Sequence, residues 1–320
     1  MDFSGMSIAG GVSIVPPIPP NQQAIFGFGS VPVAPYSTAV TNLVSSTGVV
    51  ATDTTGVGSA RNALAASTYG TDKAIFGYGY IGAPVDNYTA ITNKVSNTGV
   101  VATDTAGVGT IRQTLAAAGY GTDKGIFGFG GNGSSPFNLS TTNLVSNTGV
   151  VASDTPGVGT VRTYIAAATY GTDKAIFGFG QGVPGAVLAV TNLVSNTGVV
   201  ATDTPGVGTA RLSLGAAGYG TDKAIFGYGQ ISGGINTTLT NLVSNTGVVA
   251  SDVTSAGTAR QSPAAATYGG DKAIFGYGYA AAPLSSQVSM TNLVSSAGVV
   301  ASDTTGVGTA RSGAAASAYN

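Results

Sequence analysis

The sequence predicts an all-β protein: a six-bladed β-propeller of four-stranded blades, closed by N- and C-terminal strands that share one blade. Three observations lead to this prediction. The sequence repeats every 49 to 51 residues, each repeat has a strand-like pattern, and the chain begins and ends partway through a repeat. The expected organisation is an extended arm at residues 1–20 followed by the propeller at residues 21–320.

The repeat is defined by the string Ile-Phe-Gly-aromatic-Gly, which occurs six times. Each copy is followed by a segment containing Thr-Asn, a Gly-Val-Val turn or its equivalent, one arginine, and an alanine-rich stretch that ends in tyrosine. The isoleucines of the six copies are Ile25, Ile75, Ile126, Ile176, Ile225 and Ile274. Self-similarity at a fixed period indicates that each unit is one supersecondary structure packed against its neighbours.

Four short segments of each repeat have the character of β-strands. Residues 72–79 alternate in side-chain type, and residues 191–198 form a β-rich run that closes in Asn-Thr-Gly. Residues 198–204 would return as a further strand. Residues 213–220 lie between glycines and are too short for a stable helix, so they are expected to be another strand. Four strands in about 40 to 50 residues is typical of a propeller blade.

The two ends of the repeat region complement each other. Residues 21–29 match the second strand of a blade, and residues 312–320 match the first strand. We therefore expect the last strand to pair with residues 25–29, which would remove an open sheet edge. The small residues of the first strands would fit around a crowded central axis.

The composition excludes several function classes. The chain has no His, Cys, Trp or Glu, and its 12 basic residues nearly balance 13 acidic ones. Without His or Cys there is no Ser-His-Asp triad, no thiolate nucleophile and no ordinary zinc or copper site. Balanced charge gives no basic surface for nucleic acid, and no apolar run approaches the roughly 20 residues of a transmembrane helix. We expect no enzyme activity, no cofactor, no metal, no nucleic-acid partner and no membrane insertion. Calcium held by aspartates is the alternative.

One arginine and one aspartate recur in every repeat, the aspartate eight residues before the arginine. The arginines are Arg61, Arg112, Arg162, Arg211, Arg260 and Arg311, and the aspartates are Asp53, Asp104, Asp154, Asp203, Asp252 and Asp303. We expect a structural role, in which each arginine satisfies backbone carbonyls and pairs with an aspartate between neighbouring blades. A ring of arginines that grips an anion is the alternative.

The segment between the second and third strands differs in every repeat, whereas the strands repeat almost letter for letter. These six loops are expected at one end of the propeller, and their aromatic and amide side chains suit recognition of a glycan or a protein. The alternative is that the loops differ only because they are unconstrained. The candidate ligand contacts are Tyr36, Tyr80, Asn87, Tyr88, Asn132, Phe137, Gln181, Gln230, Asn236 and Tyr279.

The N-terminal arm combines aliphatic residues with a stiff Pro-Pro-Ile-Pro-Pro spacer. It lacks Lys and Arg and does not resemble a secretory signal. We expect the arm to bind other proteins of an assembly through Ile8, Val12, Ile14 and Val15. The alternative is a disordered terminus.

The repeats resemble those of the kelch family over about 300 of the 320 residues. Arg61, the small residues 64–66, the pair Tyr69-Gly70 and the string at 75–79 follow the order of a kelch blade, as do their counterparts. The family's adjacent glycines are here separated by an aromatic residue. The low-charge units also look like kelch-like repeats of tailed-phage virion and tail-fibre proteins.

This second resemblance implies a non-enzymatic module located on a virion surface or tail. It would be an appendage, such as a tail fibre or decoration protein, that contacts host-surface glycans or proteins. The alternative is a cellular kelch-type scaffold for protein–protein interaction, at an unknown cellular or extracellular location. A copper enzyme of the galactose-oxidase type would share the fold, but it needs His and Cys ligands, which this chain lacks.

Overall fold

The structure is a computed structural model that describes residues 22–82, 87–134, 137–282 and 284–320. The arm expected at residues 1–20, with Ile8, Val12, Ile14 and Val15, lies outside the described residues. Within the described ranges the chain is all-β, with short antiparallel strands in small sheets and no helix. Accordingly, the described residues include no helix with the length and apolar character needed to span a bilayer.

Each repeat builds one main sheet from three strands, which we call inner, middle and outer. The inner strands are β26 (Ala315–Tyr319), β3 (Ala65–Tyr69), β8 (Ala116–Tyr120), β11 (Ala166–Tyr170), β14 (Gly215–Tyr219) and β21 (Ala264–Tyr268). The middle strands are β1 (Gln23–Ser30), β4 (Lys73–Gly77), β9 (Lys124–Gly131), β12 (Lys174–Gly178), β15 (Lys223–Gly227) and β22 (Lys272–Gly276). The outer strands are β2 (Ser37–Val44), β7 (Thr92–Val95), β10 (Asn138–Val145), β13 (Thr191–Val194), β18 (Leu239–Val243) and β25 (Thr291–Val294).

Strands from the two ends of the chain share one sheet. The C-terminal inner strand β26 pairs antiparallel with β1, so that Gln23 lies opposite Tyr319 and Gly27 lies opposite Ala315. Beyond the regular ladder, the backbone N–H of Ser30 donates to the Ser312 carbonyl at 2.7 Å, and Ser312 returns a bond at 3.0 Å. This is the pairing expected between residues 312–320 and the first Ile-Phe-Gly string.

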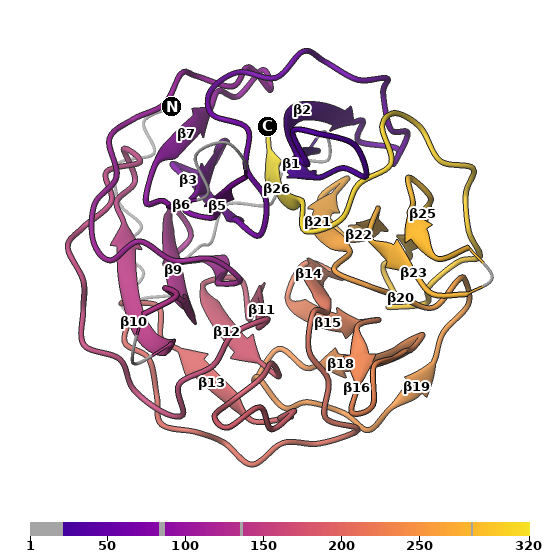
Figure 1. Ribbon diagram of the computed structural model, residues 1–320. Coiled ribbons are helices and arrows are strands. Elements are labelled where there is room, and N and C mark those ends of the chain that lie inside the picture. Colours follow the sequence, from indigo (N-terminus) through magenta and orange to yellow (C-terminus); the bar gives the residue numbers. More distant parts are fainter. Residues whose placement is uncertain (1–21, 83–86, 135–136, 283) are drawn as a thin grey trace, which may run out of the picture.

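The six main sheets lie around a common centre, with their inner strands nearest to it (Figure 1). Contacts join the inner strands in the pairs β26–β3, β3–β8, β8–β11, β11–β14, β14–β21 and β21–β26. A narrow space of about 60 Å³ is lined by residues from all six inner strands, including Ala66, Ala117 and Ala168. These positions hold alanine, glycine, serine or threonine, because larger side chains would not fit where six strands converge.

The hydrophobic core lies between neighbouring main sheets and depends on the Ile-Phe-Gly string. The Phe76 ring packs edge-on against the Phe28 ring of the preceding repeat, with centroids 5.2 Å apart. The Phe76 ring also packs against Gly27 of the preceding Ile-Phe-Gly string. Glycine is needed there, because a Cβ on Gly27 would lie only 2.8 Å from Cζ of Phe76. The repeated Phe-Gly pair is therefore explained by close packing between sheets.

The fourth strand expected in every repeat does not form as a regular strand in most of them. Residues 198–204 meet β13 at two isolated bridges, Val194 to Val200 and Thr191 to Thr204, and between them the Ala201 N–H donates to the Leu193 carbonyl at 2.8 Å. Between these bridges the Asn192 side-chain Nδ2, rather than a ladder N–H, donates to the Ala201 carbonyl at 3.0 Å. Only the sheet of β14, β15 and β18 gains a fourth strand among the described residues, the short β19 (Val253–Thr254).

Short hairpins follow the middle strands at the positions of the variable loops. The described hairpin strands are β5 (Tyr80–Ile81) with β6 (Asn87–Tyr88), β16 (Gln230–Ile231) with β17 (Ile235–Asn236), and β23 (Tyr279–Ala280) with β24 (Ser286–Gln287). The strand β20 (Arg260–Gln261) pairs with β23. In the other repeats the loops are held by isolated bridges or by extensions of β1, β2, β9 and β10.

Candidate functional site

The recurring arginines are fully buried beneath the variable hairpins. The Arg61 guanidinium lies over the Phe28 ring of the preceding repeat, with its central carbon 4.3 Å from the ring centroid. Its Nε donates to the Tyr78 carbonyl at 2.9 Å, and Nη2 donates to Oδ1 of Asn93 at 2.7 Å. All six arginines are 0% exposed, so their guanidinium groups are inaccessible to an anion in solution.

The aspartate near each arginine is not the one that the eight-residue spacing suggested. Arg61 lies 4.0 Å from Asp104 on the outer segment of its own sheet, whereas Asp53 lies next to Arg311 and binds Thr309. For Arg61 the partner is therefore an aspartate 43 residues later in its own sheet, rather than one eight residues earlier or in a neighbouring sheet. The arginine also contacts the preceding sheet, by stacking on an aromatic ring there.

Hydrogen bonds control the ionisation of these aspartates. Burial alone would raise the pKa of Asp104, but hydrogen bonds from Ser59 and Asn93 and the charge of Arg61 lower it below its usual value. The Ser59 hydroxyl donates to Asp104 at 2.6 Å. Burial lowers the pKa of Arg61 to about 10, so the guanidinium is charged at neutral pH. The same arrangement occurs in all six repeats and has a structural character.

This buried network positions the base of each hairpin. The residue after each arginine pairs with the residue that follows the Gly-aromatic-Gly turn. For example, Asn62 and Tyr80 exchange backbone hydrogen bonds at 3.0 and 2.8 Å. The aromatic residue of each turn has a left-handed backbone, as at Tyr78 with φ 64°, and this strained turn directs the chain into the hairpin.

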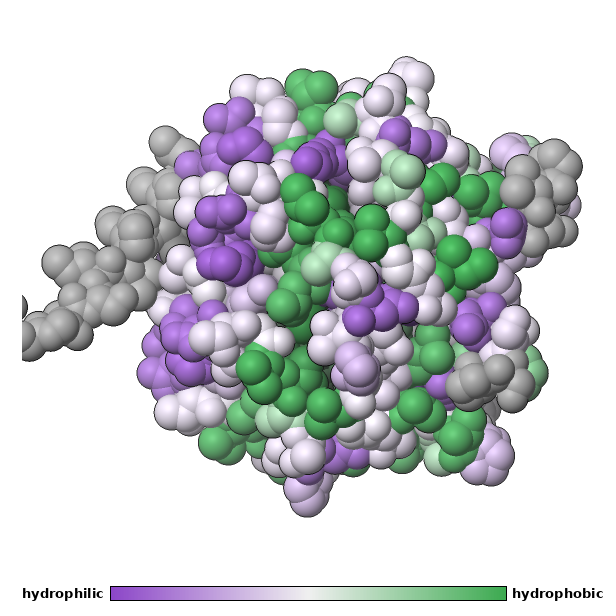
Figure 2. Space-filling model, turned by 90° about the vertical axis from the view of Figure 1, so that its left-hand side faces the viewer, coloured by the Kyte–Doolittle hydropathy of each residue, from purple (hydrophilic) through white to green (hydrophobic). Residues whose placement is uncertain are grey.

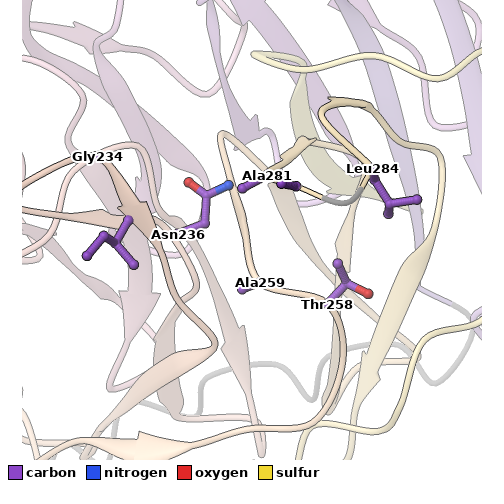
Figure 3. Close-up of a pocket in the computed structure, with 8 residues that line it drawn as sticks. Gly234, Asn236, Thr258, Ala259, Ala281 and Leu284 are labelled. Atoms are coloured by element: carbon purple, nitrogen blue, oxygen red, sulfur yellow. The ribbon is translucent and has the colours of Figure 1, made fainter.

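Hairpins of neighbouring repeats lie side by side at one end of the molecule. The Asn138 side chain donates to the Gln181 carbonyl of the next repeat at 3.0 Å, and Asn236 donates to the Tyr279 carbonyl at the same distance. A cavity of about 560 Å³ lies between the hairpins β16–β17 and β23–β24 (Figure 3). The variable segments therefore form a common surface, which we call the hairpin end.

The amide candidates named from the sequence largely support the hairpins themselves. Gln181 donates to the Gly185 carbonyl at 3.3 Å, and Gln230 donates to the Gly234 carbonyl at 3.1 Å. Asn132 accepts from the Ser134 N–H at 3.1 Å. Asn87 is an exposed residue of β6 that pairs with Ile81. These amides shape the surface more than they project from it.

The aromatic candidates fall into two groups. Tyr36 and Phe137 are 56% and 60% exposed and are free to contact a ligand. Tyr80 and Tyr88 pack edge-on against each other within one hairpin, with centroids 5.6 Å apart. Tyr279 is half-buried in β23. The structure thus brings Tyr80 and Tyr88 together and leaves Tyr36 and Phe137 outermost.

Aliphatic residues at the hairpin tips were not predicted as contacts, although they are among the most exposed hydrophobic side chains. They are 50% to 68% exposed, and they are Val33, Val183, Ile235 and Leu284. The signal was present in the sequence, because each variable segment carries at least one large apolar residue.

The lysine–aspartate pairs lie away from the hairpin end. Lys174 begins β12, whereas the hairpin follows the other end of that strand, and its Nζ lies 2.8 Å from Asp173. The described residues include five such exposed pairs, and pairs of this kind contribute little to stability. The described part of the variable segments carries no charged residue; Asp86 lies outside it.

Figure 2 shows hydrophilic residues gathered along one edge of the molecule and hydrophobic residues across its middle.

Within the described ranges, no group of three or more His, Cys, Asp or Glu side chains is placed to hold a metal ion. Comparison with protein-family models finds no match, and no curated protein is significantly similar in sequence.

Proposed function

We propose that this protein is a closed six-bladed β-propeller that acts as a non-enzymatic binding module through its hairpin end. Three observations support closure: the pairing of β1 with β26, the cyclic order of inner-strand contacts, and the small residues that line the central space. Each main sheet is then one blade. The kelch resemblance of the repeats agrees with this arrangement.

Recognition is assigned to the hairpin end because sequence variation is concentrated there. The buried arginine, asparagine and aspartate recur in every blade and hold the scaffold constant, whereas the hairpins differ in length and side chains. Rigid scaffolds that carry variable loops are a common basis for binding. This contrast between constant blades and variable hairpins is the observation that carries the proposal.

The surface chemistry supports an uncharged ligand. Apolar tips such as Phe137 and Val183 project from the described hairpins, and backbone groups and amides lie between them. A host-surface glycan fits this combination of apolar contact and neutral hydrogen bonding, and an uncharged protein surface is the second candidate.

We further propose that the module belongs to a virion, as a fibre or decoration protein attached through its N-terminal arm. This part rests on the resemblance of the repeats to tailed-phage proteins and on the apolar residues of the arm. Removal of residues 1–20 should leave folding intact but prevent incorporation into the particle. Unchanged incorporation would place the attachment site elsewhere.

The test of recognition is a glycan array probed with the full chain and two multiple variants. In the first, the exposed hairpin residues Val33, Tyr36, Phe137, Val183, Ile235 and Leu284 are changed to serine. The matched control changes six valines of 60% to 66% exposure in the Gly-Val-Val turns to serine: Val49, Val100, Val150, Val199, Val248 and Val299.

We expect the full chain and the turn variant to bind the same neutral glycans and the hairpin variant to lose them. Retention by the hairpin variant together with loss by the turn variant would contradict recognition through the hairpin end. Absence of any glycan binding by the full chain would reject the glycan and leave the protein-scaffold alternative.

A further inference from the structure

The repeat pattern is broken at the junction between the hairpins β16–β17 and β23–β24. The link before Arg260 has Ser255 and Ala256 where the other five links have glycine and valine. The Ser255 N–H donates to the Thr238 carbonyl at 3.1 Å, which continues the β18–β19 pairing and holds the link along the outer strand. A feature confined to one junction of a repeat protein is a natural place for a specific site.

Small residues leave an open space at this junction. The cavity of about 560 Å³ falls within the range of roughly 300–1,000 Å³ typical of small-molecule sites. Its walls come from one hairpin, the next hairpin and the link between them, as Figure 3 shows. The lining residues are Gly234, Ile235, Asn236, Thr258, Ala259, Ala281, Ala282 and Leu284.

Two polar side chains of the described lining, Thr258 and Asn236, offer hydrogen-bond acceptors. Thr258 donates its hydroxyl proton to Oδ2 of Asp303 at 2.7 Å, so its oxygen can only accept from a ligand. The Asn236 amide nitrogen donates to the Tyr279 carbonyl, and in Figure 3 it is directed toward Ala281, which directly follows β23. The Asn236 Oδ1 has only a long 3.5 Å contact from Gln230 and keeps acceptor capacity. Acceptors of this kind can bind the hydrogen-bond donors of a neutral ligand, such as the hydroxyls of a sugar.

The rest of the lining is uncharged and mostly apolar. Ile235 and Leu284 are 60% and 50% exposed at the hairpin tips. Such side chains can cover the C–H face of a sugar ring, while the hydroxyls around its edge reach the acceptors. A charged ligand would find no charged side chain of opposite sign in the lining.

We propose that this cavity binds the terminal neutral hexopyranosyl unit of a glycan. The site rests on the proposed function, because it names the ligand class of one part of the hairpin end. Thr258 and Asn236 accept hydroxyl hydrogen bonds from the sugar, and Ile235 and Leu284 pack against its C–H groups.

The experiment is methyl NMR of the full chain, labelled at Ile, Leu and Ala, titrated with methyl glycosides of neutral hexoses at millimolar concentration. We expect shifts at Ile235, Leu284 and Ala282, and no such shifts with an uncharged peptide. Ala282→Trp should fill the cavity and weaken binding at least about tenfold. The control Val199→Trp places the same side chain in an exposed Gly-Val-Val turn, outside the hairpin end, and should bind normally.

A second pair of variants separates ligand contact from scaffold damage. Thr258→Ala and Thr209→Ala remove equivalent hydroxyls, since Thr209 also donates to its aspartate at 2.7 Å, but only Thr258 lines the cavity. Weaker sugar binding in Thr258→Ala alone is expected. Equal loss in both variants, or sugar shifts that persist in Ala282→Trp, would overturn the site.

The two proposals can fail separately. Glycan-array binding that depends on the hairpin tips, with no hexoside shift at the cavity, would reject this site and retain recognition by the hairpin end. Cavity shifts caused by an uncharged peptide and by no hexoside would also reject it.

Discussion

Arg162 lies over the ring of Phe129, with its guanidinium carbon 4.7 Å from the ring centroid, although the two residues belong to neighbouring repeats. The same guanidinium donates to the Phe179 carbonyl at 2.9 Å and to the Val190 carbonyl at 2.7 Å. One buried side chain therefore holds its own sheet together and contacts the preceding sheet. The arrangement recurs six times, which makes the arginine the central structural residue of the repeat.

Arg162→Ala should lower the free energy of unfolding by about 3–5 kcal/mol, because it leaves buried carbonyls and Asn192 without their partner. Urea unfolding monitored by circular dichroism measures the change. The control Lys223→Ala removes an exposed pair with Asp222 and should cost less than about 1 kcal/mol. Similar losses in both variants would argue against a structural role specific to the buried arginine.

Gly208→Ala should destabilise the protein more than Gly233→Ala. Both glycines have a left-handed backbone, with φ 84° and 86°, so both substitutions introduce strain. A Cβ on Gly208 would also lie 2.3 Å from Oδ1 of Asp252, whereas a Cβ on Gly233 meets nothing within 4 Å. The comparison of melting temperatures therefore isolates the steric clash. Equal melting temperatures would show that Asp252 and its hydrogen-bond partners move at little cost to make room for the added Cβ.

Acid should destabilise the protein by protonating the six recurring aspartates that accept hydrogen bonds near the buried arginines. The folded pKa of each is lowered, because hydrogen bonds and the nearby arginine together outweigh the opposing effect of burial. The unfolded chain therefore binds more protons in this window, and the stabilisation is present above about pH 4 and lost as pH falls through the folded pKa values. Asp203→Asn should reduce the pH dependence of unfolding. A free energy of unfolding that stays constant from about pH 5 to pH 2 would contradict this assignment.

The all-β class, the inner and middle strands and the pairing of the chain ends could be predicted from sequence because they follow local periodicity. The arginine–aspartate partners could not. The spacing of eight residues between Asp53 and Arg61 is regular, but the sheet places Asp104 beside Arg61 and Asp53 beside Arg311. Because every repeat carries an aspartate at the same position, the sequence spacing does not show whether an arginine contacts the aspartate of its own repeat or that of the next repeat. The three-dimensional packing of the sheets decides between them.

The outer segments and the hairpin surface were also harder to predict. A valine-rich run such as 198–204 has strand character, yet the Asn192 side chain replaces part of the backbone ladder. Glutamines 181 and 230 were expected to face a ligand, but their amides bond to carbonyls of their own hairpins. Competition between side-chain and backbone hydrogen bonds is decided by geometry that the sequence pattern does not encode.

Closure of the six repeats into one ring is the central claim, and a disulfide tests it most directly because the chain has no native cysteine. Ser30 and Ser312 are a hydrogen-bonded antiparallel pair, for which a Cα separation of about 5.5 Å suits a disulfide. The variant with Ser30→Cys and Ser312→Cys should form an intramolecular disulfide under mild oxidation, measured by mass spectrometry and thiol titration. The control with Ser30→Cys and Ser262→Cys, where Ser262 precedes the inner strand of the adjacent sheet, should keep free thiols. Free thiols in the first variant, or equally fast oxidation in both, would contradict closure through the chain ends.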